Sequence, residues 1–372
     1  MTKDSAQNFL YIQQQAELGA FCNEAATQDW LVLDTEFMRV KNYYPKLCLI
    51  QAATRHHIAC IDPLGSLDLS PFYALLMHPK ILKVFHAAGQ DLEVLHRYSG
   101  EIPQPLFDTQ IASALTGQRD QIGYAALVLD MFGIQLAKSQ TRTDWSARPL
   151  SPAQLAYAVD DVRYLRQIFL QQTDDLERLD RRAWLDEECA ALIQPENFSL
   201  QPDKLLAKVK GARNLSSREQ AIVQQLAVWR ESQAQQKDLP RKWVISDTTL
   251  LELAQSNASN ATDLSKIPSL TPRQTGAFGP AILQQLTIAR SLPKSAWPKH
   301  ITTGSLPPAQ SQKIKQIQKS LRDIGEQYQL NPTLFSSRKE LERLVQGDTN
   351  IRLLKGWRYQ LAGQVIQQHL AI

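Results

Sequence analysis

The segment "WLVLDTEF", residues 30–37, decides the interpretation of the first half of the chain. Its apolar start is typical of a buried strand, and it ends with two carboxylates, Asp34 and Glu36. Because side chains alternate along a strand, Asp34 and Glu36 share one face while Thr35 takes the other. Two like charges on one face repel each other, so either one carboxyl stays protonated or something positive lies between them.

Further strands are predicted around this one, at residues 47–54, 57–62, 81–86 and 105–108. The short gap between the strands at 47–54 and 57–62 predicts an antiparallel hairpin. Helices are predicted at about 90–98, 108–116 and 123–132, and a long one from Pro152 with Ser151 as its N-cap. Strands that are then interspersed with helices predict an α/β domain with a five-stranded mixed sheet.

The whole chain has the composition of a globular protein, and its 372 residues predict two or three domains. We expect a cytoplasmic protein, because no apolar run has the length of a membrane helix and the N-terminus lacks the pattern of a secretion signal. Four scattered cysteines without a CxxC pair are typical of reduced thiols; they are Cys22, Cys48, Cys60 and Cys189.

The net charge of +4 conceals two halves of opposite sign. Residues 1–200 contain 17 Lys and Arg against 25 Asp and Glu, whereas residues 201–372 contain 24 against 12. A basic half attached to an acidic half indicates either a polyanionic partner or simply a solvated basic surface.

The basic half is predicted to be helical and internally repeated. Residues 194–205 are typical of a linker, and residues 216–236 form an amphipathic helix pattern with Ser216 and Glu219 at capping-box spacing. Residues 239–255 resemble residues 330–346, with Ser246 and Ser337 at equivalent positions, and the Pro- and Ser-rich residues 291–308 lie between the repeats. The repeat predicts two related helical modules.

Two more acids are candidates for a site. Asp91 in "HAAGQDLEVL" (86–95) begins a helix, where an acid can also serve simply to meet the helix dipole. In "YAVDDVRYL" (157–165), Tyr157 and Asp161 are neighbours on one helix face, and Asp161 has no basic residue three or four positions away. Asp160 can pair with Arg163, which is an ordinary surface arrangement.

Together the four acids indicate a metal site. Carboxylate oxygens without His or Cys suit hard cations such as Mg²⁺ or Mn²⁺. Two such ions about 4 Å apart can hold the attacking and leaving oxygens of a phosphoryl displacement. A divalent metal between Asp34 and Glu36 would resolve their repulsion.

The three motifs in this order resemble the ribonuclease D family, within the DEDD superfamily of 3′→5′ exonucleases. "LVLDTEF" is similar to the first motif of the family, "HAAGQDLEVL" to the second, and "YAVDDVRYL" to the third in the form with a tyrosine four residues before the aspartate. Residues 143–162 are similar to this branch in particular, and the basic half resembles HRDC domains, the helicase and ribonuclease D C-terminal domains.

The resemblance implies an α/β ribonuclease H-like exonuclease domain at 1–205, an HRDC domain at 212–292 and a divergent HRDC-like domain at 306–372. It implies that RNA, including tRNA precursors, is cut from its 3′ end to 5′-mononucleotides with two divalent ions, Mg or Mn. The implied metal-site residues are Asp34, Glu36, Asp91 and Asp161, with Asp34 bridging the metals, and Tyr157 would orient the attacking water.

Several alternatives stay open. The motifs do not separate RNA from DNA, so a DNA-directed exonuclease is the first alternative, and a non-catalytic nucleic-acid-binding protein is the second. Phe37 is either a contact for the terminal base or a core residue at the end of its strand, and Asp108 is expected to cap a helix.

Overall fold

The computed structural model describes residues 9–137, 140–298 and 306–370, which fall into two compact units. The first, which we call the sheet unit, comprises the described parts of residues 1–38, 46–194 and 306–372. The second, which we call the helical unit, comprises the described parts of residues 39–45 and 195–305.

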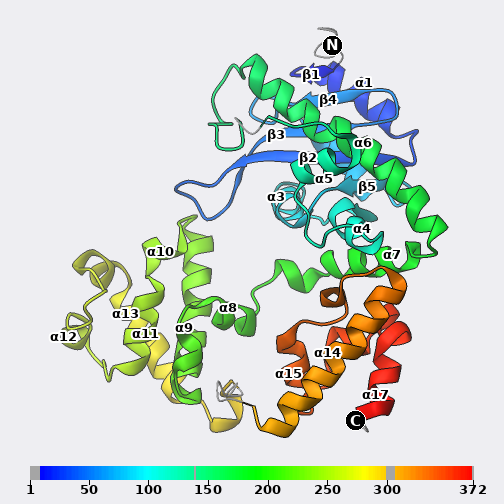
Figure 1. Cartoon of the computed structure of the whole chain (residues 1–372). Helices are drawn as coiled ribbons and strands as arrows, with labels where there is room; N and C mark the ends of the chain where they lie inside the picture. The colour runs from blue at the N-terminus through cyan, green and yellow to red at the C-terminus, as the bar shows by residue number, and fades with distance from the viewer. Residues whose placement is uncertain (1–8, 138–139, 299–305, 371–372) are drawn as a thin grey trace. The chain divides into compact units, whose positions relative to one another are not determined.

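A six-stranded mixed sheet forms the core of the sheet unit (Figure 1). The strands are β1 (Leu10–Ile12), β2 (Trp30–Met38), β3 (Lys46–Ala53), β4 (Ile58–Ile61), β5 (Leu82–Phe85) and β6 (Leu106–Asp108), in the spatial order β1-β4-β3-β2-β5-β6. β3 is antiparallel to both β2 and β4, and the other neighbouring pairs are parallel. The predicted hairpin of β3 and β4 is therefore confirmed.

The predicted count of five strands is wrong by one. β1 has only three residues and pairs in parallel with β4 from Leu10↔Ala59 to Ile12↔Ile61. Three residues are too few to show an alternating pattern of apolar and polar side chains. The segment is a strand because it pairs with β4. The other five strands lie where they were predicted, because their apolar residues are buried.

Helices cover both faces of this sheet. The first five are α1 (Gln15–Ala25), α2 (Ser70–Met77), α3 (Gly89–Ser99), α4 (Thr109–Leu115) and α5 (Tyr124–Phe132), followed by α6 (Pro152–Arg178) and α7 (Arg182–Leu192). α6 packs across β2, β3 and β4 (Figure 1). It begins with the predicted N-cap, because the Ser151 hydroxyl accepts a hydrogen bond from the Gln154 backbone amide and the Gln154 side chain completes a capping box.

The helical unit has a core of its own, built on α9 (Ser217–Gln236). Its other elements are η1 (Pro195–Phe198), α8 (Pro202–Lys208), η2 (Ala212–Asn214), α10 (Arg241–Val244), α11 (Asp247–Gln255), α12 (Ala261–Leu264), α13 (Pro272–Arg290) and η3 (Lys294–Ala296). The predicted capping box of Ser216 and Glu219 is present. α8 and η1 occupy most of the segment that was predicted to be a linker, so that prediction is wrong in part.

The described residues after 305 form a third group of helices. They are α14 (Pro308–Tyr328), η4 (Pro332–Leu334), α15 (Arg338–Val345), η5 (Arg352–Leu354), α16 (Gly356–Arg358), the π-helix η6 (Tyr359–Gly363) and α17 (Gln364–Leu370). Ser246 caps α11 and Ser337 caps α15, so the repeat in the sequence is reflected in equivalent helix starts.

These C-terminal helices pack against α7 within the sheet unit. Trp357 stacks on Trp184 with ring centroids 4.8 Å apart, and its Nε1 donates to Glu188 Oε1 at 2.9 Å. Arg358 forms an ion pair with the same Glu188, and the Arg181 guanidinium donates to the Tyr328 carbonyl at 2.6 Å.

No helix in the described part of the chain is both long and apolar enough to cross a membrane.

Candidate active site

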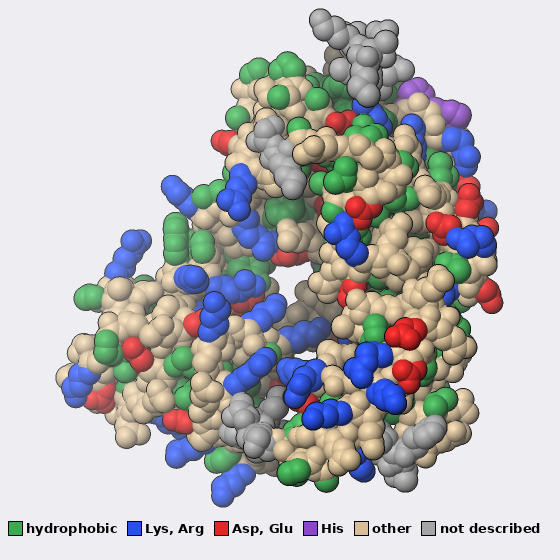
Figure 2. Space-filling view, in the orientation of Figure 1, with side chains coloured by type: hydrophobic (Ala, Val, Ile, Leu, Met, Phe, Trp, Pro, Cys, Tyr) green, Lys and Arg blue, Asp and Glu red, His purple; other side chains and the backbone are tan. Residues whose placement is uncertain are grey.

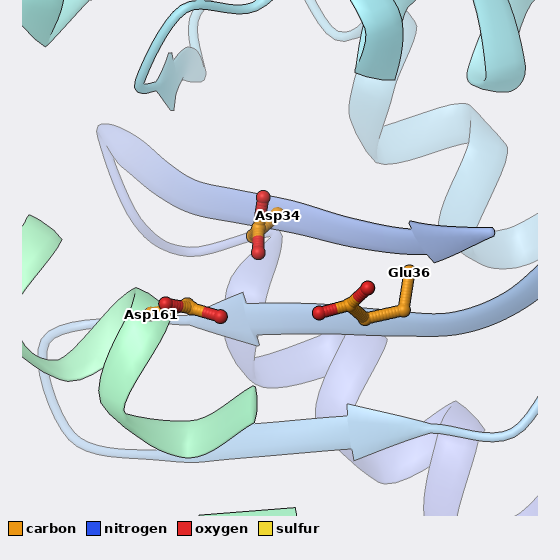
Figure 3. A group of neighbouring side chains, drawn as sticks. All are labelled: Asp34, Glu36 and Asp161. Atoms are coloured by element: carbon orange, nitrogen blue, oxygen red, sulfur yellow. The ribbon is translucent and has the colours of Figure 1, made fainter. Parts of the chain in front are cut away.

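Three carboxylates meet where β2 passes beneath α6. One side-chain oxygen each from Asp34, Glu36 and Asp161 lies within 4.8 Å of the other two. Figure 3 shows Asp34 and Glu36 from the strand and Asp161 from the helix facing a common space. The structure thus brings together acids that are 127 positions apart in the chain, as the motifs predicted.

The local structure explains why these side chains converge. Asp34 and Glu36 lie two residues apart on β2, so both point to the face that α6 covers. A β-bulge follows between Glu36 and Phe37, where the register with β3 shifts by one residue. Bulges occur often beside active sites, because they end a regular ladder and redirect the side chains around it.

The fourth predicted acid, Asp91, is outside this group of three but lines the same pocket. It lies in the first turn of α3, is 7% exposed, and its Oδ1 accepts a hydrogen bond of 2.6 Å from the Thr35 hydroxyl. Thr35 points to the opposite face of β2 from Asp34 and Glu36. Its hydroxyl therefore holds the carboxylate of Asp91.

The pocket that the acids line has a volume of about 600 Å³. Tyr157, Tyr124 and Phe37 also line it, and among the described residues its lining contains no Lys or Arg. Tyr157 is half-buried, one helical turn before Asp161, and its ring lies 6.1 Å from that of the buried Trp145. All five predicted site residues therefore border one pocket.

The pKa values of these acids reflect the lack of a positively charged side chain among the described residues of the pocket lining. Burial, together with the charges of Asp34 and Asp91, raises the pKa of Glu36 to about 9. Burial followed by the charges of Asp91 and Asp161 raises the pKa of Asp34, and burial followed by Glu36 raises that of Asp161. Burial also raises the pKa of Asp91 to about 6, although the Thr35 hydrogen bond opposes this.

The donor set fits a hard divalent cation. Carboxylate oxygens are the ligands that Mg²⁺ and Mn²⁺ prefer, and a cation would remove the repulsion that now favours protonation. The cluster of Asp34, Glu36 and Asp161 is consistent with metal binding.

Asp108 has the structural role that the sequence predicted. Its side chain caps α4 by accepting from the backbone amides of Gln110 and Ile111, and it also accepts from those of Ala87 and Ala88 before α3. It thereby fixes the turn that leads into α3, the helix that carries Asp91. Phe37 is partly exposed and borders the pocket, so it is not a pure core residue.

Tyr124 is a pocket residue that the sequence reasoning missed. Its hydroxyl donates to the Asp160 carbonyl at 2.8 Å, and burial followed by the charges of Asp161 and Asp34 raises its pKa. A tyrosine at a helix start carries no signal of its own, because only the folded chain brings α5 beside α6.

Comparison with known proteins identifies the family. A 3′-5′ exonuclease family model matches residues 9–177, and an HRDC domain model matches residues 219–286. The chain is 36% identical over 375 residues to ribonuclease D of Bartonella henselae, covering 96% of this chain and 89% of that one, and 37% identical to ribonuclease D of Pseudomonas paraeruginosa, covering 97% of each.

A solved structure agrees over nearly the whole chain. The crystal structure of Escherichia coli RNase D, described as an exoribonuclease involved in structured RNA processing, has a TM-score of 0.85 and 31% identity, and covers 98% of this chain and 99% of that one. The α/β fold is thus the ribonuclease H-like exonuclease fold that the motifs implied. The chain belongs to the ribonuclease D family of 3′→5′ exoribonucleases, with an exonuclease domain followed by a helical HRDC region.

Proposed function

We propose that this protein removes nucleotides one at a time from RNA 3′ ends and releases 5′-mononucleotides at the pocket of Asp34, Glu36, Asp91 and Asp161. The observation that carries the proposal is the convergence of carboxylates with no Lys or Arg among the described residues of the lining. Such a cluster is costly for the fold unless a cation neutralises it.

The four acids, Asp34 foremost among them, would hold two divalent ions, Mg or Mn. Bound there, the ions would supply a nucleophilic water at neutral pH and neutralise charge on the scissile phosphate. The protein's part is to fix the acids: β2 sets Asp34 and Glu36, α6 sets Asp161, and the Thr35 hydroxyl sets Asp91.

Tyr157 would orient the attacking water. Burial, followed by the charge of Asp161, raises its pKa to about 12, so its hydroxyl stays neutral at pH 7. A neutral phenol is a poor general base but can accept or donate a hydrogen bond. Tyr157 therefore serves orientation, and the acids with their ions serve activation.

The RNA would be held by the helical unit as well as by the pocket. Lys208, Lys210, Arg213 and Arg218 are exposed in the stretch from α8 to the start of α9, and Figure 2 shows basic side chains gathered over these helices. Lys and Arg contacts to phosphates strengthen binding without reading sequence. By analogy with the E. coli relative, structured RNAs with a free 3′ end are the proposed substrates, tRNA precursors among them, in the cytoplasm.

Matched single-stranded RNA and DNA oligomers test this proposal. The full-length protein with Mg²⁺ or Mn²⁺ should shorten the RNA from its 3′ end, release 5′-mononucleotides, and act poorly on DNA. Asp34→Asn is the control that should remove the activity. Equal rates on DNA would favour the DNA-directed alternative, and binding without hydrolysis would favour the non-catalytic one.

A further inference from the structure

Gln51 on β3 is a buried polar residue that the site as described so far does not use. Its side chain is 0% exposed, and neither its amide nitrogen nor its amide oxygen has a hydrogen-bond partner. A buried polar group without a hydrogen-bond partner destabilises the fold, so a side chain with two such atoms requires an explanation.

The strand register places Gln51 directly beside the metal-site acids. Gln51 pairs with Asp34 on β2 and with Cys60 on β4, so these three residues form one row across the sheet. Paired residues point to the same face, with Cβ atoms about 4.5–5.5 Å apart. α6, which carries Asp161, packs over β2, β3 and β4 on that face.

Asp161 lies over this row. One of its carboxylate oxygens lies within 4.8 Å of an oxygen of Asp34, the neighbour of Gln51 in the row. A glutamine side chain is one methylene longer than an aspartate, so its amide reaches further from the sheet toward the helix than Asp34 does. The Asp161 carboxylate, carried by the helix that packs over this row, is a hydrogen-bond acceptor on that side of the sheet.

We propose that Gln51 is a positioning residue whose amide nitrogen donates a hydrogen bond to the Asp161 carboxylate when that carboxylate holds metal. A ligating carboxylate needs a partner for the oxygen lone pairs that the metal leaves free. The inference rests on the proposed metal site, and it explains why a polar side chain is kept in the sheet at a cost to the metal-free fold.

Titration of the full-length protein with Mn²⁺ in a calorimeter, together with thermal melting without metal, tests this role. Gln51→Met keeps the volume and removes the donor. It should weaken Mn²⁺ binding by about tenfold or more, the scale of lost support behind a metal ligand, without lowering the melting temperature of the metal-free protein. Gln51→Asn keeps the amide but shortens its reach, so it should also weaken binding.

Gln172 offers a matched control. It is also 0% exposed, but its amide nitrogen donates to the Thr109 carbonyl at 3.1 Å and to the Ser113 hydroxyl at 2.8 Å. Gln172→Met should lower the melting temperature and leave Mn²⁺ affinity unchanged.

The outcomes separate the two proposals. Wild-type Mn²⁺ affinity in both Gln51 variants would overturn the positioning role. If the melting temperature of the metal-free protein also fell in those variants, Gln51 would be a packing residue. Should Gln51→Met fail to fold, the affinity of Gln51→Asn decides. A wild-type protein that binds no Mn²⁺ would instead overturn the proposed metal site.

Discussion

Two glutamates, one in each unit, show what separates a site from a structural contact. Glu231 in α9 is 2% exposed, and it is surrounded by donors: the Arg241 guanidinium, at 2.5 Å from Nη2 to Oε1, and the Tyr43 hydroxyl. Burial raises its pKa, but these hydrogen bonds outweigh burial and the pKa is lowered overall. Glu36 in β2 has Asp34 and Asp91 as its charged neighbours, and its pKa rises to about 9.

The two glutamates differ in whether the fold supplies a positively charged partner. Glu231 has its cation within the fold, so it contributes to the structure of the helical unit. Glu36 and its neighbours have none among the described lining residues, so protonation relieves their repulsion without metal, and the proposed divalent ions would take that part when bound.

Replacing one of the proposed metal-site acids by its amide should have the largest effect on RNA hydrolysis. Asp34→Asn or Asp161→Asn should abolish RNA hydrolysis, because each would remove a charged ligand of the proposed metal site. The metal-free protein should melt at the same or a higher temperature, because an amide relieves like-charge repulsion. The measurements are nucleotide release and thermal melting; near-normal turnover in either variant would contradict the assignment.

Tyr157→Phe should have a smaller effect on the same reaction. It removes the hydroxyl that we propose orients water while the four acids stay in place, so turnover should fall by about 10–10³-fold. Mn²⁺ affinity should not change. A variant with wild-type turnover would reduce Tyr157 to a residue that packs beside Trp145.

The pH dependence should distinguish the two kinds of glutamate. The pKa of Glu36 is raised to about 9 and that of Asp91 to about 6, so their contribution to metal-free stability is full below about pH 4 and is lost as the pH rises through 6 and toward 9. Metal must displace these protons, so Mg²⁺ affinity should rise by about tenfold per pH unit for each proton released.

Thermal melting with and without Mg²⁺ from pH 6 to pH 9 measures this effect. The stabilisation by Mg²⁺ should grow with pH, while the metal-free melting temperature should fall. A stabilisation that does not depend on pH would mean that the acids are already ionised without metal.

Glu231→Gln should affect stability and leave the chemistry intact. It weakens the charged hydrogen bonds to Arg241 and Tyr43 and should destabilise the helical unit by about 2 kcal/mol. Denaturant unfolding measures the loss, and hydrolysis of a short single-stranded RNA should be unchanged. A loss of turnover on that short RNA under native conditions would mean that Glu231 also contributes to the reaction, and its contrast with Glu36 would not hold.

Removing basic charge from the helical unit should affect RNA binding and leave the chemical step unchanged. With Lys208, Lys210, Arg213 and Arg218 changed to Gln, RNA affinity should fall, and the slope of log affinity against log salt should lessen by up to about 3. The control changes four exposed cations of α14 in the sheet unit to Gln, namely Lys313, Lys315, Lys319 and Arg322. Equal changes in both variants would mean that net charge alone, and not the helical unit, governs affinity.

Most of the secondary structure can be predicted from the sequence. Five strands and the helices from α3 to α6 follow from local patterns of apolar residues and caps, which act over a few residues. The common face of Asp34 and Glu36 follows from strand alternation, and the capping roles of Asp108, Ser151 and Ser216 follow from position. The motif order was specific enough to indicate the family.

Contacts between distant segments depend on the tertiary structure. β1 exists because β4 pairs with it, and the C-terminal helices join the sheet unit because Trp357 and Arg358 meet α7. Thr35 beneath Asp91, and Gln51 in the row beside Asp34, follow from sheet register and helix packing. Side-chain alternation tells which face a residue takes, but which groups share that face depends on long-range pairing that no local pattern encodes.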